Sequence, residues 1–184
     1  MSRVWLIRHA ASTASPGLAV GATDPVLSDH GREQARSLAA AMASRPLVRI
    51  LSSDRRRAVD TAAIVAATHR LDVEPTGALR EIDFGAWEGR SLSDLWTEEP
   101  DAAAAWMDDI RLTPPSFGES LDDLQRRVAR FWVSLLPLPA WGEIAVVAHA
   151  GSLAALRAVI TGEAIADTFA TRLPIAGVVA LTAG

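Results

Sequence analysis

Two histidines in this chain of 184 residues directly follow short apolar segments. Arg8 and His9 come after the apolar residues 4–7, and His149 comes after the apolar residues 144–148. An imidazole can act as a nucleophile or carry a proton, and a guanidinium group can bind two phosphate oxygens at once. These residue types therefore indicate an anion site, if the fold brings the three side chains together.

Three consecutive arginines, Arg55, Arg56 and Arg57, follow the apolar residues 47–51 and open a segment with helical spacing. The N-terminus of a helix carries partial positive charge, so these side chains oppose the helix dipole, and only Asp54 beside them compensates. A bound anion would relieve the repulsion. Because successive side chains on a helix lie about 100° apart, one or two of the three arginines can point into a cleft.

The apolar pattern predicts an α/β fold in one domain over residues 1–184. Continuous apolar runs alternate with segments of helical period, which is typical of a mostly parallel sheet covered by helices on both faces. We therefore expect a three-layer α/β/α sandwich. The predicted strands are 4–7, 47–51, 144–148 and 177–182.

Signals for the ends of helices support this division of the chain. Ser28 is a candidate N-cap, and Ser120 with Asp123 forms a capping-box pattern. Gly162 is placed to end a helix. The proline-containing stretch 87–117 interrupts the alternation and predicts a small helical cap inserted over one edge of the sheet.

Parallel strands present their carboxyl ends at one edge, where ligands bind in open sheets of this kind. We therefore expect Arg8, His9, His149 and at least one of the three arginines to meet there as an anion site. His30 and His69 lie near the ends of predicted helices, and we interpret both as structural.

The composition excludes several kinds of chemistry and partner. The chain has no cysteine and no tyrosine, and all 18 of its basic residues are arginine. Thiolate nucleophiles, disulfides, lysine Schiff bases and the lysine of a P-loop are therefore excluded. The net charge of -4 argues against a nucleic-acid partner. No segment approaches the roughly 20 apolar residues of a membrane span. We expect a cytoplasmic protein that does not bind membranes.

Five stretches, in this order along the chain, resemble the histidine phosphatase superfamily with its phosphoglycerate mutase-like fold. They are LIRHAAS, GATDPVLSDHGREQA, SSDRRRAVDTA, LREIDFGAWEG and VVAHAGSL. The resemblance extends over nearly the whole chain. The segments REIDFGAWEGRSLSDL and FGES are also similar to the α-ribazole phosphatase branch, although related broad-specificity phosphatases share them.

The resemblance implies a role for each candidate residue. His9 would be the nucleophile that forms a phosphohistidine, and Glu81 would be the proton donor, with Asp83 and Glu88 as nearby rivals. The residues implied to contact or enclose the phosphoryl group are Arg8, Arg57, His149, Ser15 and Thr23. Two guanidinium groups and a second imidazole can stabilise the charge that metals stabilise elsewhere, so we expect neither a metal nor another cofactor.

The sequence departs from the family pattern at three positions near the predicted site. Ala10 and Ala150 stand where glycine is usual, and Asp54 stands where proline is usual. Each alanine adds one methyl group, so we expect small shifts. Asp54 places a carboxylate close to the expected phosphate pocket.

Three functions are compatible with these residues. The first is a metal-independent phosphomonoesterase acting on a small phosphorylated metabolite. The second is a phosphoglycerate-mutase-type enzyme on the same scaffold, and the third is a non-catalytic phosphate-binding module. The oligomeric state is open, with a homodimer as one alternative.

The predicted cap provides the expectation for the substrate. It is acidic and contains Trp87, Trp96 and Trp106, whose rings either pack inside the cap or stack on a flat heterocycle. We expect nucleoside-like monophosphates such as α-ribazole 5′-phosphate to be preferred over phosphoglycerates and sugar bisphosphates.

Overall fold

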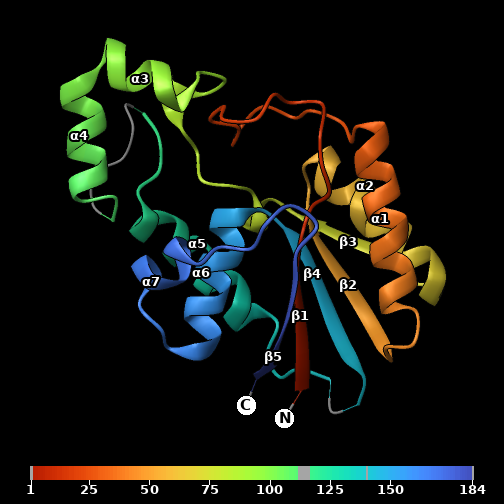
Figure 1. Ribbon diagram of the computed structural model, residues 1–184. Coiled ribbons are helices and arrows are strands. Elements are labelled where there is room, and N and C mark those ends of the chain that lie inside the picture. The colour runs from red at the N-terminus through yellow and green to blue at the C-terminus, as the bar shows by residue number, and fades with distance from the viewer. Residues whose placement is uncertain (1, 112–116, 140, 184) are drawn as a thin grey trace.

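A five-stranded sheet forms the middle of three layers in the computed structural model, which describes residues 2–111, 117–139 and 141–183 (Figure 1). The strand order is β3-β2-β4-β1-β5. The first four of these run parallel, and β5 pairs antiparallel with β1. The strands are β1 (Ser2–Arg8), β2 (Leu47–Ser53), β3 (Val73–Thr76), β4 (Glu143–Ala148) and β5 (Val178–Ala183).

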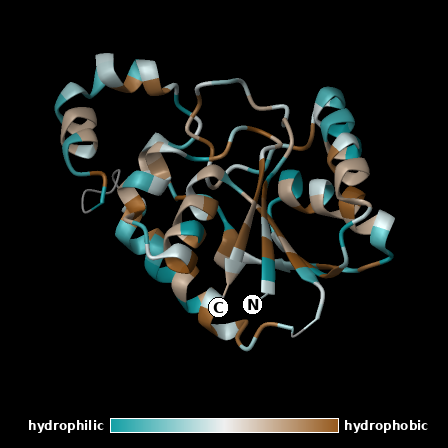
Figure 2. Ribbon diagram, turned by 60° about the horizontal axis from the view of Figure 1, so that its bottom comes forward, coloured by the Kyte–Doolittle hydropathy of each residue, from teal (hydrophilic) through white to brown (hydrophobic). Residues whose placement is uncertain are grey.

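Helices cover both faces of the sheet, so the predicted α/β/α sandwich is confirmed. One layer contains α1 (Asp29–Met42) and α2 (Arg56–His69). The opposite layer contains α5 (Leu121–Ser134), α6 (Ala150–Thr161) and α7 (Ile165–Ala170) (Figure 1). Figure 2 shows apolar residues gathered along the strands between these layers.

The central strand β4 explains why the sequence alternates between apolar strands and helices. Successive side chains of a strand point to opposite faces. Ile144 and Val146 pack with α5 and α6, whereas Ala145 and Val147 pack with α1 and α2. Both faces of β4 are therefore buried, which requires an unbroken apolar run.

The predicted helix ends are confirmed. The Ser28 side chain accepts a hydrogen bond from the backbone of Gly31, and Ser120 and Asp123 form a capping box at the start of α5. Gly162 ends α6 in the left-handed conformation, with φ of 77°. Residues 73–76 form an edge strand that the apolar pattern did not predict, because the sequence VEPT has no apolar run.

The predicted cap contains two short helices, α3 (Leu92–Glu98) and α4 (Pro100–Asp108), which lie at one end of the molecule, away from the sheet (Figure 1). Trp87 is buried and packs edge-to-face against Trp106, with 5.6 Å between ring centroids. Part of the predicted insertion, residues 112–116, lies outside the described residues. No helix in the described ranges has the length and apolar character needed to cross a membrane.

Candidate active site

The carboxyl ends of two neighbouring parallel strands bring the two candidate histidines together. In the register of β1 and β4, Arg8 lies opposite Ala148, so the next residues are His9 and His149. Their ring centroids are 5.0 Å apart, with the planes inclined by 62°. Both side chains are buried. The arrangement predicted from strand direction is thus present.

His9 has a defined hydrogen-bonding state. Its Nδ1 lies 2.8 Å from the carbonyl oxygen of Ala10. Because a carbonyl oxygen only accepts, Nδ1 carries the hydrogen and Nε2 keeps its lone pair. Burial lowers the pKa of His9 to about 3, and the positive charges of Arg57 and Arg8 act in the same direction, against the Ala10 hydrogen bond. The free imidazole is therefore neutral at ordinary pH.

His149 lies beside His9 at the start of α6. Its Nε2 is 2.8 Å from the hydroxyl oxygen of Ser53, which comes from the end of β2. Burial lowers the pKa of His149, and the nearby positive charges of Arg57 and Arg8 lower it further. Sequence reasoning missed Ser53, because a serine at the end of a strand carries no pattern that points to a histidine 96 residues away.

The two candidate arginines lie beside this pair. Arg57 is buried, and its guanidinium donates to the carbonyl oxygens of Thr23 at 2.9 Å and Val20 at 3.2 Å. Arg8 donates to the carbonyl oxygen of Leu173, while its buried Nε has no partner in the described structure. Burial lowers the pKa of both arginines, and the negative charge of Glu81 opposes that shift.

The arginine triplet is divided among three environments. Arg57 is buried, Arg55 lines a neighbouring cavity, and Arg56 is exposed. The expectation that only Asp54 compensates these charges was wrong. The Asp24 carboxylate accepts from the backbone nitrogen of Arg56 at 2.7 Å, and it caps the first turn of α2 from a distant loop.

Asp54 does not enter the phosphate site as a free carboxylate. It binds Arg80 in a two-pronged ion pair, with a shortest separation of 2.6 Å. The Arg80 hydrogen bonds hold the pKa of Asp54 below its usual range, against the effect of burial. Ala10 and Ala150, the other two departures from the family pattern, are both buried.

The carboxylate of Glu81 lies at the N-terminus of α6, where it contacts Gly151, the second residue after His149. It accepts hydrogen bonds from the backbone nitrogens of Ile82 at 2.9 Å and Gly151 at 3.0 Å. A Cβ atom at position 151 would lie 2.4 Å from the Glu81 Oε1, so a glycine is needed for this approach. Glu81 is thus the candidate acid that the fold holds at the N-terminus of α6, the helix that His149 precedes.

The two rival carboxylates are placed differently. Glu88 accepts from the backbone of Gly21 and from both the backbone and hydroxyl of Thr23, so it holds the loop before α1. Burial would raise the pKa of Glu88, but the hydrogen bonds from Thr23 and its neighbours outweigh this and lower it. Asp83 lines the same cavity as Glu81 and accepts from the backbone of Gly85, so it stays a rival.

Ser15 and Thr23 are the two predicted contacts that the structure does not join to the histidines. Ser15 is exposed in the loop before α1, and its side chain has no hydrogen-bond partner among the described residues. The Thr23 hydroxyl donates to Glu88 at 2.7 Å, and its carbonyl accepts from Arg57. Thr23 therefore contacts the site through its backbone.

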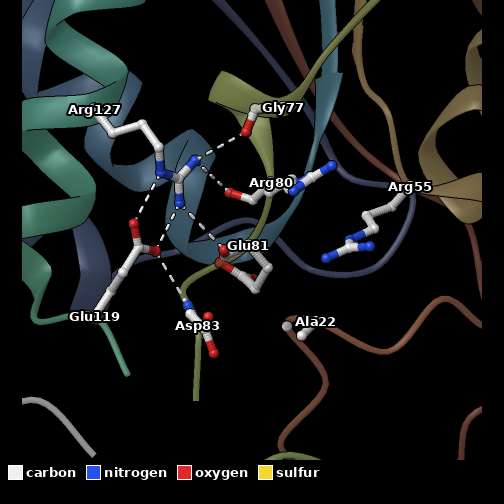
Figure 3. Close-up of a pocket in the computed structure, with 9 residues that line it drawn as sticks. Ala22, Arg55, Gly77, Arg80, Glu81, Asp83, Glu119 and Arg127 are labelled. Atoms are coloured by element: carbon white, nitrogen blue, oxygen red, sulfur yellow. Dashed lines mark hydrogen bonds and ion pairs between the residues drawn. The ribbon is translucent and has the colours of Figure 1, made fainter. Parts of the chain in front are cut away.

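A cavity of about 260 Å³ lies next to Glu81 (Figure 3). Six of its nine lining residues are charged, and among the described residues no tryptophan contributes to it. The cap tryptophans Trp87 and Trp106 pack on each other, and Trp96 is exposed. The charged side chains that line the cavity are Arg55, Arg80, Arg127, Glu81, Asp83 and Glu119.

The chain is similar in sequence to known phosphatases. The chain is 34% identical over 161 residues to an adenosylcobalamin/α-ribazole phosphatase of Escherichia coli, covering 87% of this chain and 79% of the relative. It is 33% identical over 167 residues to a glucosyl-3-phosphoglycerate phosphatase of Mycolicibacterium vanbaalenii, covering 87% and 74%.

The fold is also shared with solved structures. A mycobacterial glucosyl-3-phosphoglycerate phosphatase in complex with VO3 superposes with a TM-score of 0.89 at 30% identity, covering 99% of this chain and 91% of that one. Residues 4–184 match the family model described as the histidine phosphatase superfamily, branch 1. The chain therefore belongs to this superfamily and is a phosphatase.

Proposed function

We propose that this phosphatase is a metal-independent phosphomonoesterase that acts through a phosphohistidine at His9. The observation that carries the proposal is the state of the His9 ring. Its Nδ1 donates to the Ala10 carbonyl, and its pKa is about 3, so Nε2 is available as a neutral nucleophile. In a non-catalytic phosphate-binding module, a charged imidazole would bind the phosphate anion more strongly than this neutral ring does.

The proposed reaction has two phosphoryl transfers. In the first, Nε2 of His9 attacks phosphorus, the bond to the ester oxygen breaks, and protonated Glu81 gives its proton to the departing oxygen. In the second, the Glu81 carboxylate takes a proton from water, the water oxygen attacks phosphorus, and the bond between phosphorus and Nε2 breaks, which releases phosphate and the free His9. Arg8, Arg57 and His149 stabilise the charge on the oxygens in both steps, which is the work that a metal does elsewhere.

The nucleophile is tested by His9→Ala. The variant should retain less than about a hundredth of the wild-type turnover and no acid-labile phosphoryl label from ³²P-labelled substrate. His30→Gln, at an exposed histidine of α1, is the matched control. Wild-type turnover in EDTA should be unchanged. Retained activity or label in His9→Ala would overturn the assignment, and loss of activity in EDTA would overturn metal independence.

The cavity favours a different substrate class from the one that the sequence suggested. α-Ribazole 5′-phosphate, which corresponds to the name of the E. coli relative, would place a flat base in a cavity whose described lining is mostly charged and contains no tryptophan. Arg55 points into this cavity and has no carboxylate partner in the described structure, whereas Arg80 and Arg127 are paired (Figure 3). We propose a hydroxylated leaving group that carries a second acidic group, as in phosphoglycerate derivatives.

The substrate proposal is tested by comparing kcat/KM for 3-phosphoglycerate, its glucosyl derivative and α-ribazole 5′-phosphate at fixed ionic strength. The glycerate esters should be preferred, and Arg55→Gln should reduce that preference by about tenfold, the effect of one charged hydrogen bond. Arg56→Gln is the control, because Arg56 is the exposed neighbour. Preference for α-ribazole 5′-phosphate would restore the expectation from the sequence and leave the phosphohistidine chemistry standing.

A further inference from the structure

The backbone segment that carries Glu81 has little regular structure of its own. After the 3-10 turn η1 (Gly77–Leu79), residues 80–84 form neither a helix nor a strand. Backbone groups in such a segment need hydrogen-bond partners from elsewhere in the fold. Two residues without a role in the proposed chemistry, Arg127 and Glu119, supply them.

Arg127 of α5 lines the cavity and binds this segment (Figure 3). Its guanidinium donates to the carbonyl oxygens of Ala78 at 2.8 Å, Arg80 at 3.1 Å and Glu81 at 3.3 Å. One planar side chain thus binds the backbone carbonyl of the candidate acid and the carbonyls of two residues before it. Arginine suits this role because its five N–H donors have a fixed geometry.

Glu119 completes the arrangement on the other side of Glu81. Its two carboxylate oxygens accept from Arg127 Nε at 2.9 Å and Nη2 at 2.7 Å. The same carboxylate accepts from the backbone nitrogen of Asp83 at 3.1 Å, and the Glu119 nitrogen donates to the Asp83 carbonyl at 2.8 Å. The ion pair therefore touches the chain both before and after residue 82.

The ion pair itself is attached to a rigid element. Glu119 directly precedes Ser120, the N-cap of α5, and the capping box with Asp123 determines the start of that helix. The apolar side of α5 is buried against α6, whose N-terminus holds the Glu81 carboxylate through Gly151. The backbone of Glu81 is therefore held from α5, and its carboxylate is held from α6, which packs against α5.

We propose that the Arg127–Glu119 ion pair is a positioning device for the Glu81 carboxylate. The proposal rests on the proposed role of Glu81 as proton donor. The carboxylate reaches the Gly151 nitrogen only if the backbone at residue 81 stays in place, and that place is set by the contacts of Arg127 and Glu119. A displacement of about 1 Å in a catalytic group can cost about a hundredfold in rate.

The test uses two substrates that differ in their need for the acid. The alkyl leaving group of glycerol 3-phosphate requires protonation, whereas p-nitrophenyl phosphate releases a stable phenolate. The measured quantity is kcat/KM, which includes steps up to release of the alcohol and excludes the later hydrolysis of the phosphohistidine. In Arg127→Met it should fall at least about tenfold for glycerol 3-phosphate and less than about threefold for p-nitrophenyl phosphate.

Three further variants make the result specific. Arg126→Met changes the preceding residue of α5, an exposed arginine paired with Asp123, and should leave the ratio between the kcat/KM values of the two substrates unchanged. Glu119→Gln keeps an acceptor for the Asp83 backbone nitrogen but removes the charge. It should show a smaller loss of kcat/KM than Arg127→Met, again selective for glycerol 3-phosphate. This variant also serves if Arg127→Met does not fold. Glu81→Gln should show the selective loss in full.

The outcomes separate the proposal from its premise. Suppose that Glu81→Gln shows the selective loss, but that folded Arg127→Met or Glu119→Gln lowers kcat/KM equally for both substrates or for neither. The ion pair is then structural and the proposal is wrong. If Glu81→Gln itself is not selective, Glu81 is not the acid, and both the proposed role and the positioning inference are overturned. Selective loss in all three variants, with an unchanged ratio in Arg126→Met, supports the proposal.

Discussion

Buried neutral histidines should make the stability of this protein depend on pH between about 7 and about 5. In the folded chain the pKa of His9 is about 3, because burial and the nearby Arg57 and Arg8 disfavour its charged form. In the unfolded chain the ring is in water and has its ordinary pKa of about 6.5. Between these two values the unfolded state binds a proton that the folded state does not bind, so the free energy of unfolding falls as the pH falls.

The size of the effect follows from the same two values. Each pH unit below about 6.5 costs about 1.4 kcal/mol, so His9 alone removes about 2 kcal/mol of stability between pH 7 and pH 5. This is a large part of the 5 to 15 kcal/mol, roughly, that stabilises an ordinary domain. Burial also lowers the pKa of His149, which therefore changes stability in the same direction.

The assay is urea unfolding at about pH 7 and about pH 5, without phosphate, because a bound ligand would stabilise the folded state. Between pH 7 and pH 5, roughly, the free energy of unfolding of His9→Gln should fall by about 2 kcal/mol less than that of the wild type. Carboxylates that are common to both proteins cancel in this comparison, and His30→Gln controls for the loss of an imidazole as such. An equal loss in the wild type and His9→Gln would refute the claim that His9 is buried as the neutral base.

Three further changes have distinct expected results. Gly151→Ala should push the Glu81 carboxylate aside, since the new Cβ would lie 2.4 Å from its Oε1, and should lower kcat/KM for glycerol 3-phosphate more than for p-nitrophenyl phosphate at unchanged Tm; equal kinetics with the wild type would contradict this. Ser120→Ala should cost about 1 kcal/mol in urea unfolding, because it removes the N-cap of α5; no loss would mean that the cap is replaced. Asp54→Asn should change the free energy of unfolding by less than about 1 kcal/mol, because its partner Arg80 is exposed; a larger loss in the same assay would contradict the view that solvent screens this ion pair.

The positions of the two histidines were predictable because local rules determine them. An unbroken apolar run predicts a buried strand, and parallel strands place the next residue at the same edge of the sheet. Strand direction alone therefore brings His9 and His149 to one edge. The strand β3 (Val73–Thr76) could not be found in this way, because an edge strand needs no apolar run and tolerates Pro75.

The candidate acid was not predictable from local rules. Glu81, Asp83 and Glu88 lie within eight residues in one irregular stretch, and their side chains have similar chemistry. Glu81 is distinguished by a contact to Gly151, 70 residues away, and Glu88 by its contact to the loop at Thr23, whereas Asp83 stays a rival. The resemblance to the superfamily pointed to Glu81, but no spacing in the sequence carries that contact.

The sequence by itself determined the kinds of chemistry open to this protein and the elements that carry them. Without cysteine, lysine or tyrosine, covalent attack is left to serine, threonine, histidine, aspartate or glutamate, and arginine is the only permanent cation for binding phosphate. The apolar pattern specifies the strands that end in histidine and arginine. The tertiary structure alone decided which arginine of the triplet is buried, that the ring nitrogen left free on His9 is Nε2, and how Glu81 is held. The physical reason is that burial and hydrogen bonding depend on residues distant in sequence, whereas strand and helix formation depends on neighbours.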